Sequence, residues 1–393
     1  MKLFILFTCI ALATASAAQE KQDLKNIIDA NFQLAAGQYQ LLEKNTPDDK
    51  MPKTFKEGKS ESSAISWWTS GFFPGSLWLI YEATGDAEIK NIAEKRLKLE
   101  EGVQRFTGNH DIGFMIFCSF GNAYRITQDP HYKKIIDTAS AWQIKRYKPS
   151  IQAIQSWDKS NKFQCPVIID NMMNLEQLCW ATEHGGTRQY RQIAIAHANT
   201  TLRNHFRKDN SSYHVVDYDN NTGNVIKKVT HQGFADESAW SRGQAWGLYG
   251  YTLMYRFTKD KKYLKQANAI AKFMIHHPNM PADMIPLWDY NAPEGLNALR
   301  DASAGAIMAS ALLELATYAK KHKQEYLNVA EKAIRTLSGN TYLAKPGEIG
   351  GFLLKHSVGS LPHNSEVDVP LTYADYYFFE AMRRYKNWME KKK

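Results

Sequence analysis

Two aspartates have the sequence surroundings of catalytic acids. Asp111 lies in the segment NHDIGF, and Asp170 lies between the apolar run 167–169 and Met172. Burial among apolar groups raises a carboxyl pKa because desolvation disfavours the charge, and a second carboxylate nearby raises it further. Such a group stays protonated near neutral pH and serves as a general acid. The alternative is that each aspartate caps the helix that it precedes, which is the interpretation for Asp301 and Asp375.

Basic, amide and aromatic side chains accompany the two aspartates in the same motifs. Arg242, in the segment SRGQAWG, has a planar guanidinium that suits a substrate carboxylate, and the alternative is an ion pair with Asp236 or Glu237. A tryptophan face suits stacking on a sugar ring, and the alternative for each tryptophan is core packing. The residues expected at a substrate site are Trp68, His110, His214, His231, Gln232, Trp240, Arg242, Gln244 and Trp246.

A repeated unit along the chain indicates how these residues are positioned. In each unit an apolar helix that is rich in small residues is followed by a short turn, such as TGD at 84–86 or TKD at 258–260, and then by an amphipathic helix. Apolar helices are typical of burial on all sides, and amphipathic helices of an outer layer. The first helices are expected to start near Gly71, Gly113, Asp170, Arg242, Asp301 and Tyr373, and the helix over 24–42 supplies the last outer member.

Six inner and six outer helices predict an all-α fold, an (α/α)6 barrel. The inner helices would all point the same way, so their N-terminal loops would share one rim, where partial positive charge favours carboxylate ligands. The aspartates and the other motif residues all fall at that rim. The long loop before the fourth unit, over 213–229, is predicted to form a β-hairpin.

Composition and charge exclude several classes of protein. The chain has 393 residues and a formal charge of +9, and the basic residues are spread along the sequence, which argues against nucleic-acid binding. No nucleotide, metal or cofactor motif is present, and no apolar run after the N-terminus reaches 18 residues. Residues 1–18 have the charged start, apolar stretch and small-residue end of a signal peptide. We therefore expect a periplasmic or secreted protein whose residues 19–393 form one catalytic domain.

The motifs WTSGFFPG, HDIGF, IDNMMN, HQG and SRGQAWGLYG resemble those of unsaturated glucuronyl hydrolases, glycoside hydrolase family 88. The resemblance extends from about Trp67 to about Tyr377. It implies a substrate whose non-reducing end is a 4,5-unsaturated uronic acid, and hydration of the C4=C5 vinyl ether without a metal or cofactor. Asp170 would be the general acid and base, and Asp111 would assist through substrate hydroxyls and tune the Asp170 pKa.

The resemblance also implies binding roles for other residues. His214, Gln232 and Arg242 would surround the unsaturated sugar and its carboxylate, and the three tryptophans would be stacking surfaces. The segment 352–359 stands where the family has a histidine-containing loop that contacts sugar. There Lys355, His356 and Ser357 are candidates for binding a sulfate or the next sugar, and a solvated loop is the alternative.

Three other functions remain open at this point. They are an unsaturated rhamnogalacturonyl hydrolase on the same barrel, a non-catalytic sugar-binding protein and a polysaccharide lyase. The preference for sulfated or unsulfated glycosaminoglycan is open as well, and we expect a monomer or a weak homodimer.

Overall fold

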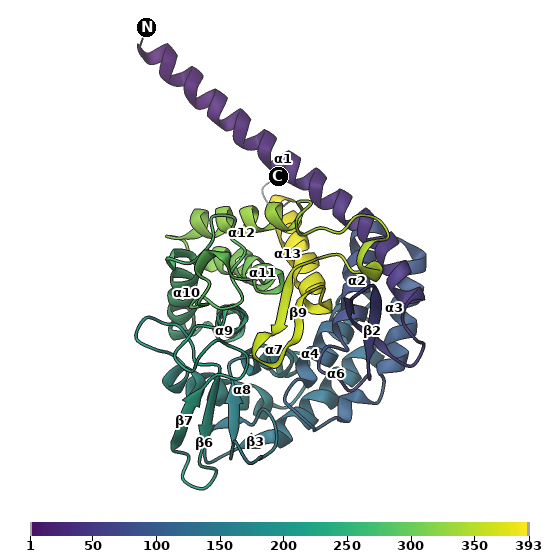
Figure 1. The fold of residues 1–393 in the computed structure, drawn as a ribbon, viewed down its shortest axis with the longest axis vertical. Helices are drawn as coiled ribbons and strands as arrows, with labels where there is room; N and C mark the ends of the chain where they lie inside the picture. The colour runs from purple at the N-terminus through teal and green to yellow at the C-terminus, as the bar shows by residue number, and fades with distance from the viewer. Residues whose placement is uncertain (1, 391–393) are drawn as a thin grey trace.

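The computed structural model describes the backbone of residues 2–390 and the side chains of residue 19 and residues 22–390. Met1 and the side chains of the rest of the predicted signal peptide lie outside the described residues, as do residues 391–393 at the end of the predicted domain. The backbone of residues 2–18 is the start of α1 (Lys2–Lys44), which extends away from the rest of the molecule in Figure 1. Among the described residues, no helix is long and apolar enough to cross a membrane.

Within residues 2–390, inner helices contact one another in a closed ring, which confirms the predicted barrel (Figure 1). The inner helices are α2 (Phe72–Thr84), the continuous segment α4, η2 and α5 (Ile112–Ile116, Phe117–Gly121 and Asn122–Thr127), α7 (Asn171–Glu183), α9 (Ser241–Thr258), α11 (Ala302–Tyr318) and α13 (Thr372–Glu390). The outer helices are α3 (Ala87–Glu100), α6 (Pro130–Gln143), α8 (Arg188–Asn204), α10 (Lys261–His276), α12 (Lys323–Leu337) and α1.

The alternation of apolar and amphipathic helices explains the two layers. Along α11, nearly every side chain is small or apolar and buried, because the helix has neighbours on all sides. Along α12, a stripe that includes Leu327, Ala330 and Ile334 is buried, and the charged residues face outward. The sequence pattern predicts the first outer helix over residues 89–106, and the end of that prediction is wrong. The helix ends at Glu100, and a 3-10 turn, η1 (Val103–Arg105), follows it.

Each recurring turn ends an inner helix with a residue in the left-handed conformation and starts the outer helix with an aspartate cap. Gly85, Gln128 and Lys259 take left-handed conformations at the ends of their inner helices. The aspartates that follow in the turns, such as Asp86 and Asp260, accept backbone N–H groups at the starts of the outer helices. The short inner–outer connections are therefore built from local sequence.

Small sheets occupy the longer loops that lead into the inner helices. The strands are β1 (Met51–Lys56), β2 (Lys59–Ser63), β3 (Tyr147–Lys148), β4 (Ala153–Ile154), β5 (Pro166–Ile168), β6 (Val215–Tyr218), β7 (Val225–Val229), β8 (Ser357–Ser360) and β9 (Ser365–Val369). The antiparallel pair β6–β7 confirms the predicted hairpin, and β5 adds a third strand beside β6. The β8–β9 hairpin was not predicted, and its connecting 3-10 turn is η6 (Leu361–His363).

The remaining 3-10 turns are short connections in these loops. They are η3 (Ile144–Arg146), η4 (Gly295–Asn297) and η5 (Glu348–Gly351).

Candidate active site

A cavity of about 380 Å³ lies at the rim formed by the starts of the inner helices. It brings together seven of the predicted site residues, namely Trp68, His110, Asp111, Asp170, His231, Gln232 and Arg242. These residues come from the loops before α2, α4, α7 and α9 and from the first turn of α9. The shared rim was the central expectation from the repeat, and the cavity confirms that it gathers these residues.

Neither aspartate is used as a helix cap. Asp111 and Asp170 occupy the N-cap positions of α4 and α7, but neither side chain accepts a hydrogen bond from its helix. By contrast, Asp301 accepts from the backbone N–H of Ser303 at the start of α11, as expected. Since a cap would consume the carboxylate, the absence of one leaves both groups available to the cavity.

Burial makes both carboxyl groups weaker acids than usual, because it raises their pKa values. Desolvation raises the pKa of Asp170 to about 7, with Arg242 opposing the shift and the charge of Asp111 adding to it. Desolvation likewise raises the pKa of Asp111 to about 7, against the effects of Asn174 and Arg146. Within the described residues, Asp170 Oδ2 is buried and has no hydrogen-bond partner. A carboxyl group in this state can hold a proton near neutral pH and give it to a bound substrate.

His214 faces Asp170 in a defined tautomeric state. Its Nδ1 accepts backbone N–H groups from His231 and Gln232 at 3.2 and 3.1 Å, so the neutral ring carries its proton on Nε2. Nε2 lies 3.7 Å from Asp170 Oδ2. Burial lowers the pKa of His214 well below its usual value, so the ring stays neutral beside the acid. His214 is itself 3% exposed and lies behind the cavity wall.

His110 holds a similar place beside Asp111. Its Nε2 lies 3.4 Å from Asp111 Oδ1, and desolvation lowers the pKa of His110 to about 3. Both aspartates are therefore flanked by neutral imidazoles, which add polarity near each carboxyl group without adding a formal charge.

A close helix contact positions the two acids relative to each other. Asn174, one turn after Asp170 in α7, accepts the backbone N–H of Phe114 in α4 at 2.9 Å. A Cβ on Gly113 would lie 2.6 Å from Asn174 Oδ1 and 2.8 Å from Asn174 Cα. Only glycine allows α4 and α7 to approach this closely.

Arg242 is more constrained than the sequence suggested. Its partner is Asp301, at 3.2 Å, and not Asp236 or Glu237. Its two terminal nitrogens also donate to the backbone carbonyls of Val358 and, at 2.6 Å, Gly359. The guanidinium lines the cavity but does not present a free fork, because ring closure brings α9, α11 and β8 together around it.

Three of the predicted binding residues lie away from the cavity surface. Trp246 is fully buried and packs between Phe114 and Tyr377, with ring centroids 5.1 and 5.3 Å away. Trp240 is 3% exposed and packs against His214 and Arg242. Gln244 accepts from the backbone N–H of Ser212 at 2.8 Å and donates to the carbonyl of Trp240. Core packing is thus the correct interpretation of both tryptophans, and Gln244 fixes a loop.

The predicted loop residues 355–357 also lie outside the cavity lining. Lys355 Nζ donates to the carbonyl of Asn340, His356 Nδ1 lies 2.7 Å from Asp368, and Ser357 is buried in β8. None of the three lines this cavity, and their contact with a sulfate or the next sugar stays a prediction. The same hairpin does reach the cavity, but through later positions in the chain.

Part of the cavity wall was not predicted from the sequence. The unpredicted lining residues are Trp67, Asn109, Ser156, Trp157, Ile168, Gly359, Ser360, His363, Ser365, Glu366 and Tyr373. Trp67 and Trp157 could have been predicted from the sequence, because they are aromatic residues in loops at the rim. The hairpin residues carry no such signal, because their approach to the cavity depends on how β8 and β9 pair.

Comparisons with known proteins agree with this geometry. The family model of Glycosyl Hydrolase Family 88 matches residues 43–390. The unsaturated glucuronyl hydrolase of Formosa agariphila is 48% identical over 324 residues, covering 81% of this chain and 80% of that protein. The unsaturated chondroitin disaccharide hydrolase of Streptococcus pyogenes serotype M1 is 33% identical over 329 residues, covering 82% of each protein.

Solved structures give the same result for the fold. A crystal structure of an unsaturated glucuronyl hydrolase specific for heparin superimposes with a TM-score of 0.90 at 46% identity, covering 93% of this chain and 98% of that one. The structure of the unsaturated glucuronyl hydrolase from Bacillus sp. GL1 gives a TM-score of 0.83 at 30% identity, covering 90% and 96%. The chain belongs to glycoside hydrolase family 88, and it is a glycosidase.

Proposed function

We propose that the protein is an exported unsaturated glucuronyl hydrolase that removes the 4,5-unsaturated uronic acid from the non-reducing end of glycosaminoglycan oligosaccharides made by lyases. The observation that carries the proposal is Asp170, a carboxyl group at the cavity wall with a pKa of about 7 and an unpaired buried oxygen. The relatives named above support the substrate class, since they are an unsaturated glucuronyl hydrolase, an unsaturated chondroitin disaccharide hydrolase and an unsaturated glucuronyl hydrolase specific for heparin.

The reaction begins with proton transfer from Asp170 to C4 of the vinyl ether, which leaves positive charge shared between C5 and the ring oxygen. Water then adds at C5 and gives its proton to the Asp170 carboxylate, so the acid is regenerated. The resulting hemiketal opens, and the leaving sugar departs with its glycosidic oxygen. Neutral His214 beside Asp170 donates toward the carboxylate formed after the first step, because its proton is on Nε2.

Two other groups suit this chemistry. Asp111, beside His110, is available to hydrogen-bond substrate hydroxyls, and its charge raises the Asp170 pKa. Arg242 supplies positive charge to a substrate carboxylate from a fixed position, with its terminal nitrogens held by Asp301 and two carbonyls. The tryptophans that can stack on sugar are Trp67, Trp68 and Trp157, since these line the cavity.

The test follows the ultraviolet absorbance of the conjugated carboxylate while wild type and Asp170→Asn are incubated with unsaturated disaccharides. We expect absorbance to fall with wild type and the fall to slow by about 10²-fold or more in the variant. Exposed Asp49, changed to Asn, is the matched control and should retain full activity. Chondroitin-derived and heparin-derived disaccharides, each sulfated and unsulfated, define the substrate preference.

Other outcomes would identify the other functions. A fall only with pectin-derived substrates would indicate a rhamnogalacturonyl hydrolase, and binding without any fall would indicate a sugar-binding protein. A rise on intact polysaccharide would indicate a lyase.

Export and assembly are part of the proposal. The composition of residues 1–18 supports a cleaved signal peptide, which N-terminal sequencing of the protein from its native host would check by a start near residue 19. We propose a monomer or a weak homodimer, which sedimentation over a range of protein concentrations would check.

A further inference from the structure

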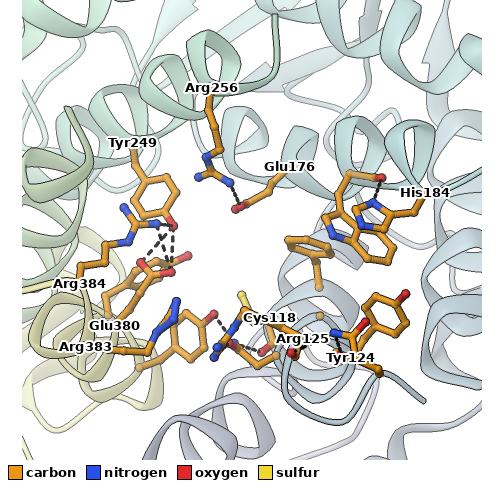
Figure 2. A pocket seen from close by; sticks show the side chains of 17 residues that line it. Cys118, Tyr124, Arg125, Glu176, His184, Tyr249, Arg256, Glu380, Arg383 and Arg384 are labelled. Atoms are coloured by element: carbon orange, nitrogen blue, oxygen red, sulfur yellow. Dashed lines mark hydrogen bonds and ion pairs between the residues drawn. The ribbon is translucent and has the colours of Figure 1, made fainter. Parts of the chain in front are cut away.

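A second cavity, of about 340 Å³, lies at the other end of the inner helices (Figure 2). Its wall comes from the later turns of the helices whose starts form the catalytic rim, and it includes residues of η2, α5, α7, α9 and α13. The buried rings of Phe114, Trp246 and Tyr377 pack against one another between the two ends of the barrel. No residue in the described part of the chain lines both cavities, so this is a separate compartment.

The wall of this cavity is unusually rich in arginine. Among the described residues, its lining includes Arg125, Arg256, Arg383 and Arg384 and two carboxylates, Glu176 and Glu380. The Glu380 carboxylate already accepts hydrogen bonds from Tyr249, at 3.0 Å, and from Ser310. The lining alone therefore carries two more positive than negative formal charges, four guanidinium groups against two carboxylates.

Three of the four arginines are fully engaged by carboxylates. Arg256 Nε pairs with Glu314 at 2.7 Å, and Arg384 pairs with the same carboxylate at 2.9 Å. Glu314 is not itself a lining residue, so it holds these arginines from behind. Both terminal nitrogens of Arg125 donate to Glu82, one of them at 2.8 Å.

Arg383 is different. Its Nε is buried and makes no hydrogen bond among the described residues. That same Nε lies 3.4 Å from Glu82 Oε2, and the Glu82 carboxylate already accepts twice from Arg125. Desolvation and the neighbouring Arg125 lower the pKa of Arg383, against the opposing effects of Glu82 and Glu380. A partly buried guanidinium that shares its carboxylate with a second arginine favours an anion, and its planar fork matches a carboxylate.

The opposite wall is flat and aromatic. The rings of Trp180 and His184 stack 3.8 Å apart at 14°, and Tyr124 meets Trp180 edge-on. In Figure 2, His184 lies on the side of the cavity opposite Arg383 and Arg384. A flat or ring-shaped ligand body would pack on this wall while an anionic group faced the arginines.

One of the helices that line this cavity has an irregular turn. Residues Phe117–Gly121, in the middle of the second inner helix, form a π-helical turn, and Phe117, Cys118 and Gly121 all line the cavity. Single π-helical turns inside α-helices occur frequently at functional sites. This irregularity widens the helix where the cavity is formed.

We propose that this second cavity binds a small organic carboxylate, with the carboxylate at Arg383 and a flat or ring-shaped body against Trp180 and His184. The size of the cavity is at the lower end of the range for small-molecule sites, which suits one ring and its acid group. The site is independent of the catalytic cavity and of the function proposed for it.

The test is titration calorimetry of the full chain with two probes, glucuronate as a sugar acid and 4-bromobenzoate as an aromatic acid. Arg383→Met removes the charge and keeps much of the volume. Arg188→Met, at an exposed position on α8, is the matched control. We expect at least one probe to bind wild type and the control equally, and to bind Arg383→Met about tenfold more weakly or worse. The probe that responds identifies the source of the carboxylate.

A crystal grown with 4-bromobenzoate locates its bromine independently of any variant. Density between Arg383 and Trp180 supports the proposal. The proposal is overturned if neither probe binds at about 10 mM, if every probe that binds wild type binds Arg383→Met with unchanged affinity, or if bromine is found only in the catalytic cavity. Unfolding by urea shows whether Arg383→Met is folded, and if it is not, the bromine position decides alone.

Discussion

Replacement of Gly113 by alanine tests whether the contact between α4 and α7 sets the spacing of the two acids. Gly113 lies two residues after Asp111, and Asn174 lies four residues after Asp170. The new Cβ would be 2.8 Å from Asn174 Cα, a backbone atom that cannot move without moving α7. Ordinary contact begins at 3.4 Å, so the shortfall is 0.6 Å (3.4 minus 2.8).

That shortfall predicts effects on both stability and rate. In a helix interior, alanine normally stabilises by up to about 1 kcal/mol relative to glycine. Overpacking in a well-packed core costs about 1–3 kcal/mol, so we expect a net loss of about 1 kcal/mol in the free energy of unfolding. A displacement of about 1 Å can lower a rate about 10²-fold, so 0.6 Å predicts roughly a tenfold fall in kcat.

Urea unfolding and the absorbance assay measure the two effects. Gly37 of α1 is the matched control, because it is exposed and a Cβ there meets nothing within 4 Å. Gly37→Ala should leave kcat unchanged and stabilise slightly. A Gly113→Ala variant that is as active as wild type and no less stable would show that the two helices are not held at the distance that glycine requires.

Three other predictions concern protons and charges. Activity should fall about tenfold per pH unit above about pH 7, because Asp170 acts while protonated and its pKa is about 7. A pH–rate profile that stays flat to about pH 9 would contradict this. Asp301→Ala should lower the free energy of unfolding by about 3–5 kcal/mol, because it leaves the buried Arg242 without its carboxylate partner. A loss under about 1 kcal/mol in urea unfolding would count against a stabilising Arg242–Asp301 ion pair. Burial raises the pKa of Glu100 from 4.5 to about 8, so the folded state holds a proton that the unfolded chain loses, and stability should decline between about pH 4.5 and pH 8. Glu100→Gln should make that decline shallower, because the other buried carboxyl groups with raised pKa values, Asp111, Asp170 and Asp375, still contribute to it. Thermal unfolding at about pH 5 and about pH 9 in both proteins would show the same slope in each if the assignment is wrong.

The architecture follows largely from the sequence, because its signals are local. The turns that contain Gly85, Gln128 and Lys259 end inner helices through their own backbone conformation, and the aspartates after them cap the next helix within a few residues. The contrast between apolar α11 and amphipathic α12 is also visible in the residues themselves. The shared rim follows from that alternation, and with it the meeting of Asp111 and Asp170.

The tertiary structure decided what each side chain does at the rim. Arg242 and Asp301 are 59 residues apart, and only ring closure makes them partners. Trp246 and Trp68 look alike in sequence, but one points into the core and the other lines the cavity. The proton on His214 Nε2 is fixed by two backbone N–H groups of a distant loop. Local pattern determined which elements form, whereas burial and pairing depend on contacts between elements far apart in the chain, which no short segment encodes.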